Sequence, residues 1–418
     1  MKRFPYQYSP GFKFWKQKLM YWANSNFDFF AYLDGNASPY PSEPFQNLFF
    51  AGSQELSESE IWNESRKQFK VGIIGYDYKN QLEKLKSENP SYLGLPELCF
   101  FTPSICFQFE KDQVNSKYKL SEGFWKEIET VELPNSNTSC DVISHLNKME
   151  YIEKVHAIQE QIREGETYEL NFCQTFEGTF ENWDPISSFF QLQEVSPMPF
   201  SVLFKAGSKW LVSASPERFL KKVGTKIIAQ PIKGTIRRGK NEIEDQENKQ
   251  ALLESEKERA ENLMITDLTR NDLSKISKTG SVQVQELFGI YELPRVFQMI
   301  STVQSTLKPD ISFKEIIDAT FPMGSMTGAP KIRTMELIDE LESFKRNWFS
   351  GAFGWIDEKG DFDFSVIIRS ILADLATKKL YFGVGSAITS DAEAALEYEE
   401  CLLKAQVLLE VLHGKPRK

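Results

Sequence analysis

The stretch FPMGSMTGAPK, at positions 321–331, separates two segments with helical spacing of apolar residues, at 313–320 and 332–341. Pro330 suits the first turn of the second helix, where no backbone N–H is needed and the fixed φ of proline is already helical. Gly328 lets backbone N–H groups approach a ligand closely, because it carries no Cβ. The stretch fits an ordinary helix–loop–helix connection or an anion site at a helix N-terminus, for which a carboxylate is as suitable as a phosphate.

Composition and charge narrow the class of protein. The chain has 418 residues, 41% hydrophobic and 26% charged, enough for two or three domains or one large intertwined fold. A net charge of -10 argues against nucleic-acid binding, and no apolar run reaches the length of a membrane span. Five cysteines without a CxxC pair and three scattered histidines favour reduced thiols in a cytoplasmic protein, with no zinc site and no histidine-based triad.

The pattern along the chain divides it at a linker. We expect residues 1–140 to form an aromatic-rich segment that packs on, and is interwoven with, a catalytic part at 141–418, with a linker at 132–141. A helix is predicted at 144–163. Short strands broken by turns favour large mixed or antiparallel sheets with helices outside, and not a βαβ alternation. Strands are expected at 46–51, 71–76, 98–108, 167–175, 200–204, 210–214 and 226–232.

Two strand ends carry candidate catalytic groups. Glu217 follows Pro216, which fixes the turn, and a partly buried glutamate there can have a raised pKa and act as a general acid. The alternative is a surface glutamate paired with Arg218. Lys233 precedes Gly234 at the end of an apolar strand, where a desolvated lysine loses part of its charge and becomes a nucleophile. The alternative is a solvated lysine beside a turn.

Two stretches far apart in the sequence carry acidic side chains at helical spacing. In 250–263 these are Glu254, Glu258 and Glu261, and in 393–411 they are Glu397 and Glu400. Brought together, the two faces would supply the oxygen ligands that Mg²⁺ prefers. The alternative is two solvated faces, whose acids would pair with nearby basic residues. Those basic residues are Lys257, Arg259 and Lys404.

The second acidic helix has recognisable ends and follows another glycine-rich junction. Ser390 and Glu393 predict a capping box at its start, and Gly414 predicts its end. The junction before it is the segment Gly383-Val384-Gly385-Ser386-Ala387. It is a second place where a strand leads into a helix through glycines.

Arg369 is a lone charge in the apolar, strand-forming run 364–372. A buried guanidinium needs a partner, and a carboxylate that accepts two hydrogen bonds is the natural one. That carboxylate is either an internal acid or part of a substrate. Together these candidates indicate a site for a small dicarboxylic ligand on Mg²⁺.

Seven segments, in this order, resemble the chorismate-utilising enzymes, which include anthranilate, aminodeoxychorismate, isochorismate and salicylate synthases. The resemblance is strong over residues 165–410 and weak in the aromatic N-terminal part. It implies an α+β fold of four layers, α/β/β/α, with two large mixed or antiparallel sheets around the site. The segments are SASPERF (213–219), PIKGT (231–235), ERAENLMITDLTRNDL (258–273), FPMGSMTGAPKIRTMELI (321–338), GAFGWID (351–357), VIIRS (366–370) and GVGSAITSDAEAALEYEE (383–400).

The resemblance also implies how chorismate and Mg²⁺ are bound. Glu261 and Glu400 would hold the metal, with Glu258 and Glu397 supporting it through water. The metal would hold the ring carboxylate of chorismate. Arg369 would clamp the enolpyruvyl carboxylate. The other substrate-binding residues that the resemblance implies are Gly328, Thr235, Gly385, Ser386 and Ala387.

Within the family, the likeness is closest to the component I subunits of aminodeoxychorismate synthases. Lys233 stands where anthranilate synthases typically carry alanine, and it would attack C2 of chorismate while Glu217 protonates the departing C4 hydroxyl. Glu315 is assigned, by counting back from Gly324, to the position of a histidine linked to pyruvate elimination in anthranilate synthases. Both departures imply a product that keeps its enolpyruvyl group.

Two further positions depart from the family pattern. Glu169 stands where ammonia-using members usually have glutamine and water-using members lysine. Phe349 replaces a tyrosine or tryptophan near the substrate.

No segment resembles a glutaminase, so ammonia is expected from solution or from a separate glutamine amidotransferase subunit. Two alternatives stay open at this point. One is anthranilate synthase component I, and the other is a non-catalytic chorismate-binding subunit. Retention of Glu217, Lys233 and the four acids argues against the second, because a binding protein needs no general acid.

Overall fold

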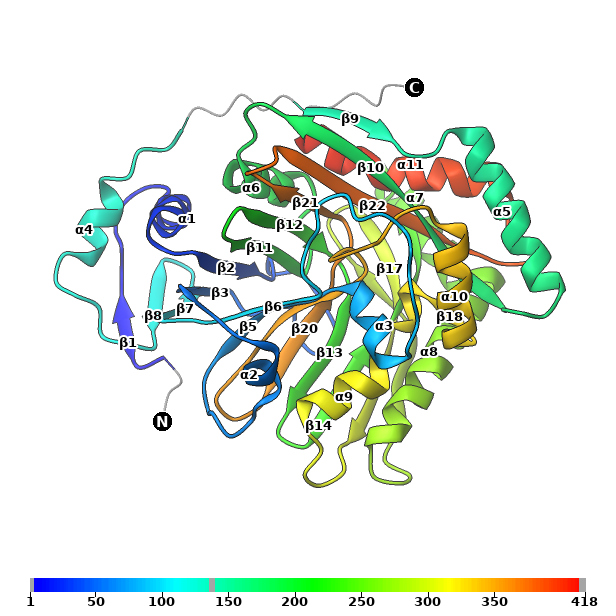
Figure 1. Ribbon diagram of the computed structural model, residues 1–418, viewed down its shortest axis with the longest axis horizontal. Coiled ribbons are helices and arrows are strands. Elements are labelled where there is room, and N and C mark those ends of the chain that lie inside the picture. Colours follow the sequence, from blue (N-terminus) through cyan, green and yellow to red (C-terminus); the bar gives the residue numbers. More distant parts are fainter. Residues whose placement is uncertain (1–3, 135–139, 413–418) are drawn as a thin grey trace.

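The computed structural model describes residues 4–134 and 140–412, and two large antiparallel sheets form its centre (Figure 1). Within these residues the first sheet has twelve strands and the second has ten. The first runs in the order β1 (Tyr6–Tyr8), β8 (Gln113–Ser116), β7 (Ile105–Glu110), β3 (Leu48–Gly52), β2 (Phe29–Asp34), β11 (Phe200–Ala206), β12 (Lys209–Ser215), β21 (Ser370–Asp374), β22 (Lys379–Ile388), β10 (Glu169–Phe180) and β18 (Gly328–Ala329), with β9 (Cys140–Ser144) also beside β10.

The second sheet faces the first and is completed by strands from the N-terminal part of the chain. Its order is β15 (Ile232–Arg237), β17 (Val296–Thr306), β14 (Lys226–Gln230), β13 (Arg218–Val223), β20 (Phe362–Val366), β19 (Ala352–Ile356), β5 (Lys70–Ile74), β6 (Leu98–Thr102) and β4 (Gln54–Glu55), with β16 (Gln283–Glu292) also beside β17. Residues before and after position 140 therefore share both sheets.

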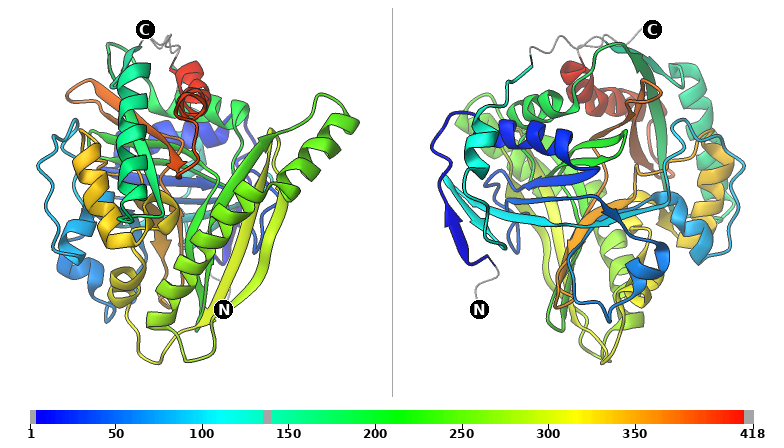
Figure 2. Two further views of the ribbon diagram at one scale, coloured as in Figure 1. Left: turned by 90° about the vertical axis from the view of Figure 1, so that its right-hand side faces the viewer. Right: turned by 60° about the vertical axis from the view of Figure 1, so that its left-hand side comes forward.

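Helices cover the outer faces of the two sheets (Figure 2). The first sheet is covered by α1 (Trp15–Asn26), α5 (Lys148–Arg163), α6 (Pro185–Val195) and α11 (Ala394–Val411), and the second by α7 (Glu242–Glu254) and α8 (Glu256–Ile276). The other helices are α2 (Glu58–Trp62), α3 (Lys79–Leu82), α4 (Phe124–Glu129), α9 (Phe313–Thr320) and α10 (Lys331–Leu341), with single turns η1 (Tyr76–Tyr78) and η2 (Gly324–Met326). This arrangement confirms the predicted four-layer α/β/β/α class.

Two stretches of chain pass from one sheet to the other at the same place. One leaves β12 of the first sheet and enters β13 of the second, and the other runs from β20 back to β21. The two stretches stay hydrogen-bonded at the crossing, since Val366 N donates to Glu217 O (3.0 Å) and Ala214 N donates to Arg369 O (3.1 Å). Glu217 and Arg369 thus lie at the junction of the sheets.

The main hydrophobic core lies between the sheets and is rich in aromatic rings. Phe204, on β11 of the first sheet, packs against Phe353 on β19 of the second, with ring centroids 5.4 Å apart, and against Trp348 at 5.9 Å. All three side chains are buried. A second core lies between the first sheet and its helices. Edge and tilted ring contacts of this kind add to the free energy of burial.

Several expected elements have different ends in the structure. The run 364–372 is not one strand, because β20 ends at Val366 and β21 begins at Ser370. The run 98–108 is likewise two strands, β6 and β7, in different sheets. The acidic stretch 250–263 is broken at Ser255, whose side chain accepts from Glu258 N and starts α8. Glu254 therefore belongs to another helix than Glu258 and Glu261.

The start of α11 differs from the prediction. The predicted end of this helix and part of the predicted linker lie outside the described residues. Glu393 is itself the N-cap of α11 and makes no side-chain cap, so the capping box with Ser390 is wrong. Gly414 and most of the Pro-Asn-Ser-Asn linker lie outside the described residues. The division of the chain at position 140 stays a prediction.

The sequence led us to expect reduced cysteines and no membrane span. The five cysteines are buried thiols. None of the described helices combines the length and the apolar content that crossing a membrane requires.

We expect Phe204→Ala to lower the free energy of unfolding by about 3–5 kcal/mol, because it removes a buried ring between two sheets that cannot close the gap. Urea unfolding followed by tryptophan fluorescence measures this loss. Phe14→Ala is the matched control, since the Phe14 side chain is 62% exposed. Equal stability of both variants would contradict the two-sheet core.

Candidate active site

A cavity of about 200 Å³ lies where the two crossings meet the helices α8 and α11. It contains the acid, the lysine, the arginine and the four carboxylates that the sequence singled out. Among the expected site residues, those that line it are Glu217, Lys233, Thr235, Arg369, Gly385, Ser386, Ala387, Glu258, Glu261, Glu397 and Glu400. Gly328 is not among the lining residues, and its role in substrate binding stays a prediction.

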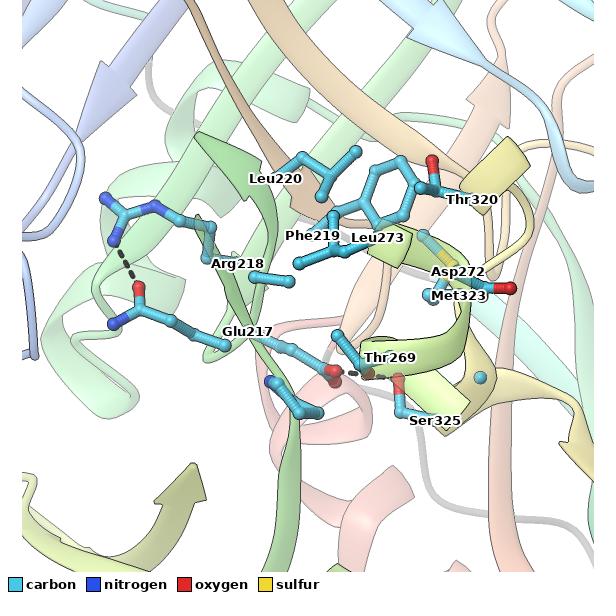
Figure 3. Close-up of a pocket in the computed structure, with 14 residues that line it drawn as sticks. Glu217, Arg218, Phe219, Leu220, Thr269, Asp272, Leu273, Thr320, Met323 and Ser325 are labelled. Carbon is cyan, nitrogen blue, oxygen red and sulfur yellow. Dashed lines mark hydrogen bonds between the residues drawn. The ribbon is translucent and has the colours of Figure 1, made fainter. Parts of the chain in front are cut away.

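Glu217 is held as a buried acid. Its side chain is almost fully buried, and its Oε1 accepts a hydrogen bond from Ser325 Oγ at 2.7 Å (Figure 3). Burial raises the pKa of Glu217 to about 7, although the Ser325 hydrogen bond and the charge of Lys233 lower it in part. Glu217 and Ser325 also line a second cavity of about 30 Å³, which is large enough for a water molecule.

Lys233 lies in an irregularity of β15 and faces a buried acid. The register of β15 against β17 shifts between Ile232 and Thr235, and Gly234 has a φ of 91°, as in a β-bulge. Lys233 Nζ lies 2.6 Å from Glu169 Oε1. Burial lowers the pKa of Lys233, but the negative charges of Glu169, Glu261 and Glu217 outweigh burial and raise it. The expectation that desolvation removes its charge is therefore wrong for the free enzyme.

Arg369 has a guanidinium without an acidic partner. In residues 4–134 and 140–412 no carboxylate lies within ion-pair distance of it, and its one polar contact is Nη1 to Met198 Sδ at 3.7 Å. Burial lowers the pKa of Arg369 to about 10. Its backbone has a φ of 49°, a left-handed conformation that costs a non-glycine residue about 1 kcal/mol or more. The internal salt bridge considered from the sequence is thus absent from the described structure.

The four glutamates of α8 and α11 all line the cavity, and two lysines pair with three of them. Lys257 Nζ lies 3.3 Å from Glu397 and 4.0 Å from Glu261. Lys404 Nζ lies 2.7 Å from Glu400 and also donates to Gly385 O at 2.8 Å.

Burial affects two of these acids strongly. It raises the pKa of Glu261 to about 7, and it raises the pKa of Glu258 as well. The lysines near Glu258 and Glu261 therefore do not fully offset the effect of burial on the pKa of these two carboxylates.

These residues fit a divalent cation in chemistry, although they do not yet form a closed cluster. Among the described residues, no three acidic, histidine or cysteine side chains are placed around one point. However, the donors are all carboxylates, which Mg²⁺ prefers. In addition, Glu261 Oε1 is buried and accepts no hydrogen bond from residues 4–134 or 140–412. A cation here would satisfy that oxygen and replace the lysines as the positive charge.

Close packing fixes the backbone of the two glycine-rich segments, and both segments also contribute residues to the cavity wall. Gly385 lies on β22 opposite Cys173, and a Cβ at Gly385 would come within 2.5 Å of Cys173 Sγ. Ser386 Oγ lies 3.0 Å from the buried Tyr151 hydroxyl of α5. Gly328 has a φ of 146°, and a Cβ there would lie 2.0 Å from Glu169 O. Pro330 is the N-cap of α10, and the FPMGSMTGAPK stretch contributes Ser325 and Met326 to the cavity.

Sequence analysis missed several residues that line the cavity. Gln298 is buried on β17, opposite Thr235, and its Oε1 has no hydrogen-bond partner. Lys257 and Lys404 had been considered only as partners on solvated faces. The spacing of Lys257 and Lys404 beside the four glutamates was the signal that could have found them. Gln298 had no such signal, because no strand was predicted where β17 lies. The lining residues not predicted for the site include Asn171, Lys257, Gln298, Ser325 and Lys404.

The structure shows where two of the residues that depart from the family pattern lie. Phe349 lines the cavity and packs on Gly383. Glu315 does not lie in the site, because it is exposed and forms the capping box of α9 with Ser312. The interpretation that Glu315 replaces a catalytic histidine is therefore wrong, and its capping role explains the residue.

Comparison with known proteins identifies the family. Residues 21–410 match the family described as chorismate binding enzyme. The chain belongs to this family. It is 33% identical over 353 residues to aminodeoxychorismate synthase component 1 of Klebsiella aerogenes, covering 82% of this chain and 77% of the relative. It is 31% identical over 360 residues to anthranilate synthase component 1 of Thermus thermophilus, covering 82% and 77%.

Solved structures of this family agree on the fold. Anthranilate synthase component I from Streptococcus pneumoniae superposes with a TM-score of 0.74 at 24% identity, and the match covers 92% of each chain. At this identity the likeness establishes the fold alone. The role of the cavity therefore rests on the residues that this chain places there.

Glu217→Gln tests the buried acid through the pH dependence of stability. The raised pKa means that the folded state keeps its proton to higher pH than the unfolded chain, so the stabilisation is complete below about pH 4.5 and is lost as pH rises through about 7. Glutamine does not titrate, so the variant should lose less stability between pH 5 and pH 8, by on the order of 3 kcal/mol. Urea unfolding at both pH values measures this difference.

The exposed Glu110→Gln is the control and should follow the wild type at both pH values. A wild-type loss of stability that Glu217→Gln leaves unchanged would show that Glu217 is ionised in the fold.

Proposed function

We propose that this protein aminates chorismate to 4-amino-4-deoxychorismate, as the component I subunit of an aminodeoxychorismate synthase. The observation that carries the proposal is Lys233 Nζ in a cavity that also holds Glu217. An amine and a protonated carboxyl in one site suit a displacement in which one group attacks while the other protonates the leaving hydroxyl.

The binding part of the site supports a dianionic substrate. Arg369, which pairs with no acid of the described chain, would pair with the enolpyruvyl carboxylate through its planar fork. The ring carboxylate would lie near the carboxylates of α8 and α11 by way of Mg²⁺, which Glu261 and Glu400 would hold directly and Glu258 and Glu397 through water. When bound, the metal supplies the positive charge that lets a carboxylate approach these acids.

The remaining substrate contacts come from the cavity wall. Thr235, Gly385, Ser386 and Ala387 line it and would contact the ring and its carboxylate. The contact proposed from the resemblance for Gly328 would need a backbone N–H that reaches the cavity from β18.

The chemical part would proceed in two displacements. Lys233 attacks C2, the ring double bonds shift, and the C4–O bond breaks as Glu217 gives its proton to the departing oxygen, which leaves as water. Ammonia then attacks C4, the double bonds shift back, and Lys233 leaves. Two allylic steps replace one difficult displacement, which is the usual advantage of covalent catalysis. The ammonia would come from solution or from a separate glutamine amidotransferase subunit, in the cytoplasm.

Anthranilate formation is the second candidate, because a relative of that activity is 31% identical. The two activities differ in product, since anthranilate is aromatic and fluorescent whereas aminodeoxychorismate keeps its enolpyruvyl group. Lys233 in the cavity favours the second product.

The experiment is a product assay with chorismate, ammonium chloride and MgCl₂, analysed by liquid chromatography and mass spectrometry. We expect aminodeoxychorismate, and we expect loss of turnover when EDTA removes the metal. Lys233→Ala should reduce turnover by about a hundredfold or more while chorismate binding is retained. Anthranilate as the product would refute the proposal in favour of the second candidate. If chorismate is bound but not consumed, the protein is a non-catalytic chorismate-binding subunit.

Arg369→Lys tests the proposed carboxylate clamp. Lysine keeps the charge but loses the planar fork, so kcat/KM for chorismate should fall about tenfold to a hundredfold with little change in melting temperature. Arg237→Lys is the control, because the Arg237 side chain is 73% exposed and lies outside the cavity. A lower melting temperature with unchanged kinetics would assign Arg369 a structural role.

A further inference from the structure

We propose that Glu169 keeps the nitrogen of Lys233 positively charged in the covalent adduct, and so makes that nitrogen the group that leaves when ammonia attacks. The inference rests on the proposed function and adds a residue that lies behind the cavity. It concerns the second displacement, which needs a leaving group as much as a nucleophile.

The geometry pairs Glu169 with one cation. Its Oε1 lies 2.6 Å from Lys233 Nζ, and the side chains of Glu169 and Lys233 are only 2% and 10% exposed. Glu169 Oε2 is buried and has no hydrogen-bond partner among the described residues. In the described part of the chain Lys233 is therefore the one charged group that compensates this carboxylate. Because both groups are out of water, their attraction is little screened.

The backbone holds Glu169 in place. It is the first residue of β10 and pairs with Ala329 of β18. Thr167 Oγ1 donates to Glu169 O at 2.9 Å, and Gly328 approaches that same oxygen so closely that no Cβ would fit. This explains why the Gly328 stretch matters to the site although Gly328 does not line the cavity. The backbone that carries this carboxylate is held from two sides, which keeps the carboxylate beside Lys233 Nζ.

The bond changes define what the lysine nitrogen needs. In the first displacement Lys233 first loses one proton to solvent water and then forms the N–C2 bond, so its nitrogen becomes a secondary ammonium ion. In the second displacement ammonia forms the N–C4 bond and the C2–N bond breaks. The electron pair of that bond stays on Lys233, which leaves as a neutral amine. Had the adduct nitrogen lost its proton, Lys233 would have to leave as an amide anion, a far poorer leaving group.

The other acids near Lys233 have different tasks in the proposed reaction. The groups that face it are Glu169, Glu217 and Glu261. Glu217 has given its proton to the departing hydroxyl and is the base that takes a proton from the new C4 ammonium. Glu261 is the proposed Mg²⁺ ligand. Glu169 alone is left to stabilise the charged adduct.

The same charge opposes the first displacement, because it holds Lys233 as an ammonium ion in the free enzyme. Glu169 therefore slows the attack of Lys233 on C2 and speeds the departure of Lys233 from C2. Its removal should affect the two steps in opposite directions. A role in folding or packing alone would not produce that split.

The test uses Glu169→Gln in the full chain with MgCl₂. In the first stage, chorismate without ammonia is mixed with enzyme, and the adduct on the Lys233 peptide is followed by rapid quench and mass spectrometry over a range of pH. In the second stage, ammonium chloride is added and the loss of the adduct is timed. We expect the variant to form adduct at lower pH than the wild type, and to lose it to ammonia about tenfold to a hundredfold more slowly.

Two further variants complete the design. Glu169→Asp keeps the charge and should restore much of the ammonia-dependent step, which also covers the case in which Glu169→Gln does not fold. Glu166→Gln is the matched control, because Glu166 precedes the same strand but pairs with Arg333 on the surface. It should behave like the wild type in both stages.

Other outcomes would overturn the inference. If Glu169→Gln slows adduct formation and leaves its loss to ammonia unchanged, Glu169 acts on the attack and not on departure. If the wild type makes aminodeoxychorismate without an adduct on Lys233, this inference fails and the proposed function stands. If the wild type does not consume chorismate with ammonium and MgCl₂, the proposed function itself fails.

Discussion

The paired crossing between the two sheets is the constraint on which the site depends. Two antiparallel stretches can leave one sheet and enter another only if both break at the same level, since otherwise backbone groups would be left unpaired in the core. Here Glu217 O and Arg369 O accept hydrogen bonds across the break, so the backbone stays satisfied. The side chains at the break are released from the alternation of the strands and reach the cavity between the sheets.

Charged groups without a partner of opposite charge are concentrated in this cavity. Several other buried ions of the described chain form ion pairs, as in the contact of Arg346 with Glu342 or of Arg218 with Asp363. Among the described residues, the Arg369 guanidinium in the cavity has no acidic partner, and burial raises the pKa of both Glu217 and Glu261 to about 7. Perturbed groups gathered in one cavity are the physical sign of a binding or catalytic site.

The general architecture and much of the site were predictable from the sequence, for identifiable reasons. Alternating strands broken by turns indicated large sheets, and the order of seven motifs indicated the family. Glu217 and Lys233 stood out because each directly follows or precedes a residue that bends a strand. Glu258, Glu261, Glu397 and Glu400 stood out because acids at helical spacing repel one another unless something positive lies between them.

What the sequence could not supply was contact between distant segments. The run containing Arg369 has the composition of one strand, and only the pairing with β12 and β13 reveals the break and the left-handed backbone. The ion pair of Lys233 with Glu169 joins residues 64 positions apart. Glu315 was assigned to the site wrongly for a related reason. Counting positions along the chain does not show whether a residue caps a helix or lines a cavity.

The charges of the cavity also constrain how a substrate enters it. Five acids line it (Glu217, Glu258, Glu261, Glu397 and Glu400) against four bases (Lys233, Lys257, Arg369 and Lys404). A dianion alone would approach the acids of α8 and α11 unfavourably, and a dication alone would approach the lysines unfavourably. Mg²⁺ and chorismate together add no net charge, so each removes the repulsion that the other would meet. For the proposed reaction, metal and substrate should therefore bind cooperatively, with Lys257 and Lys404 displaced from Glu397 and Glu400 as the pair enters.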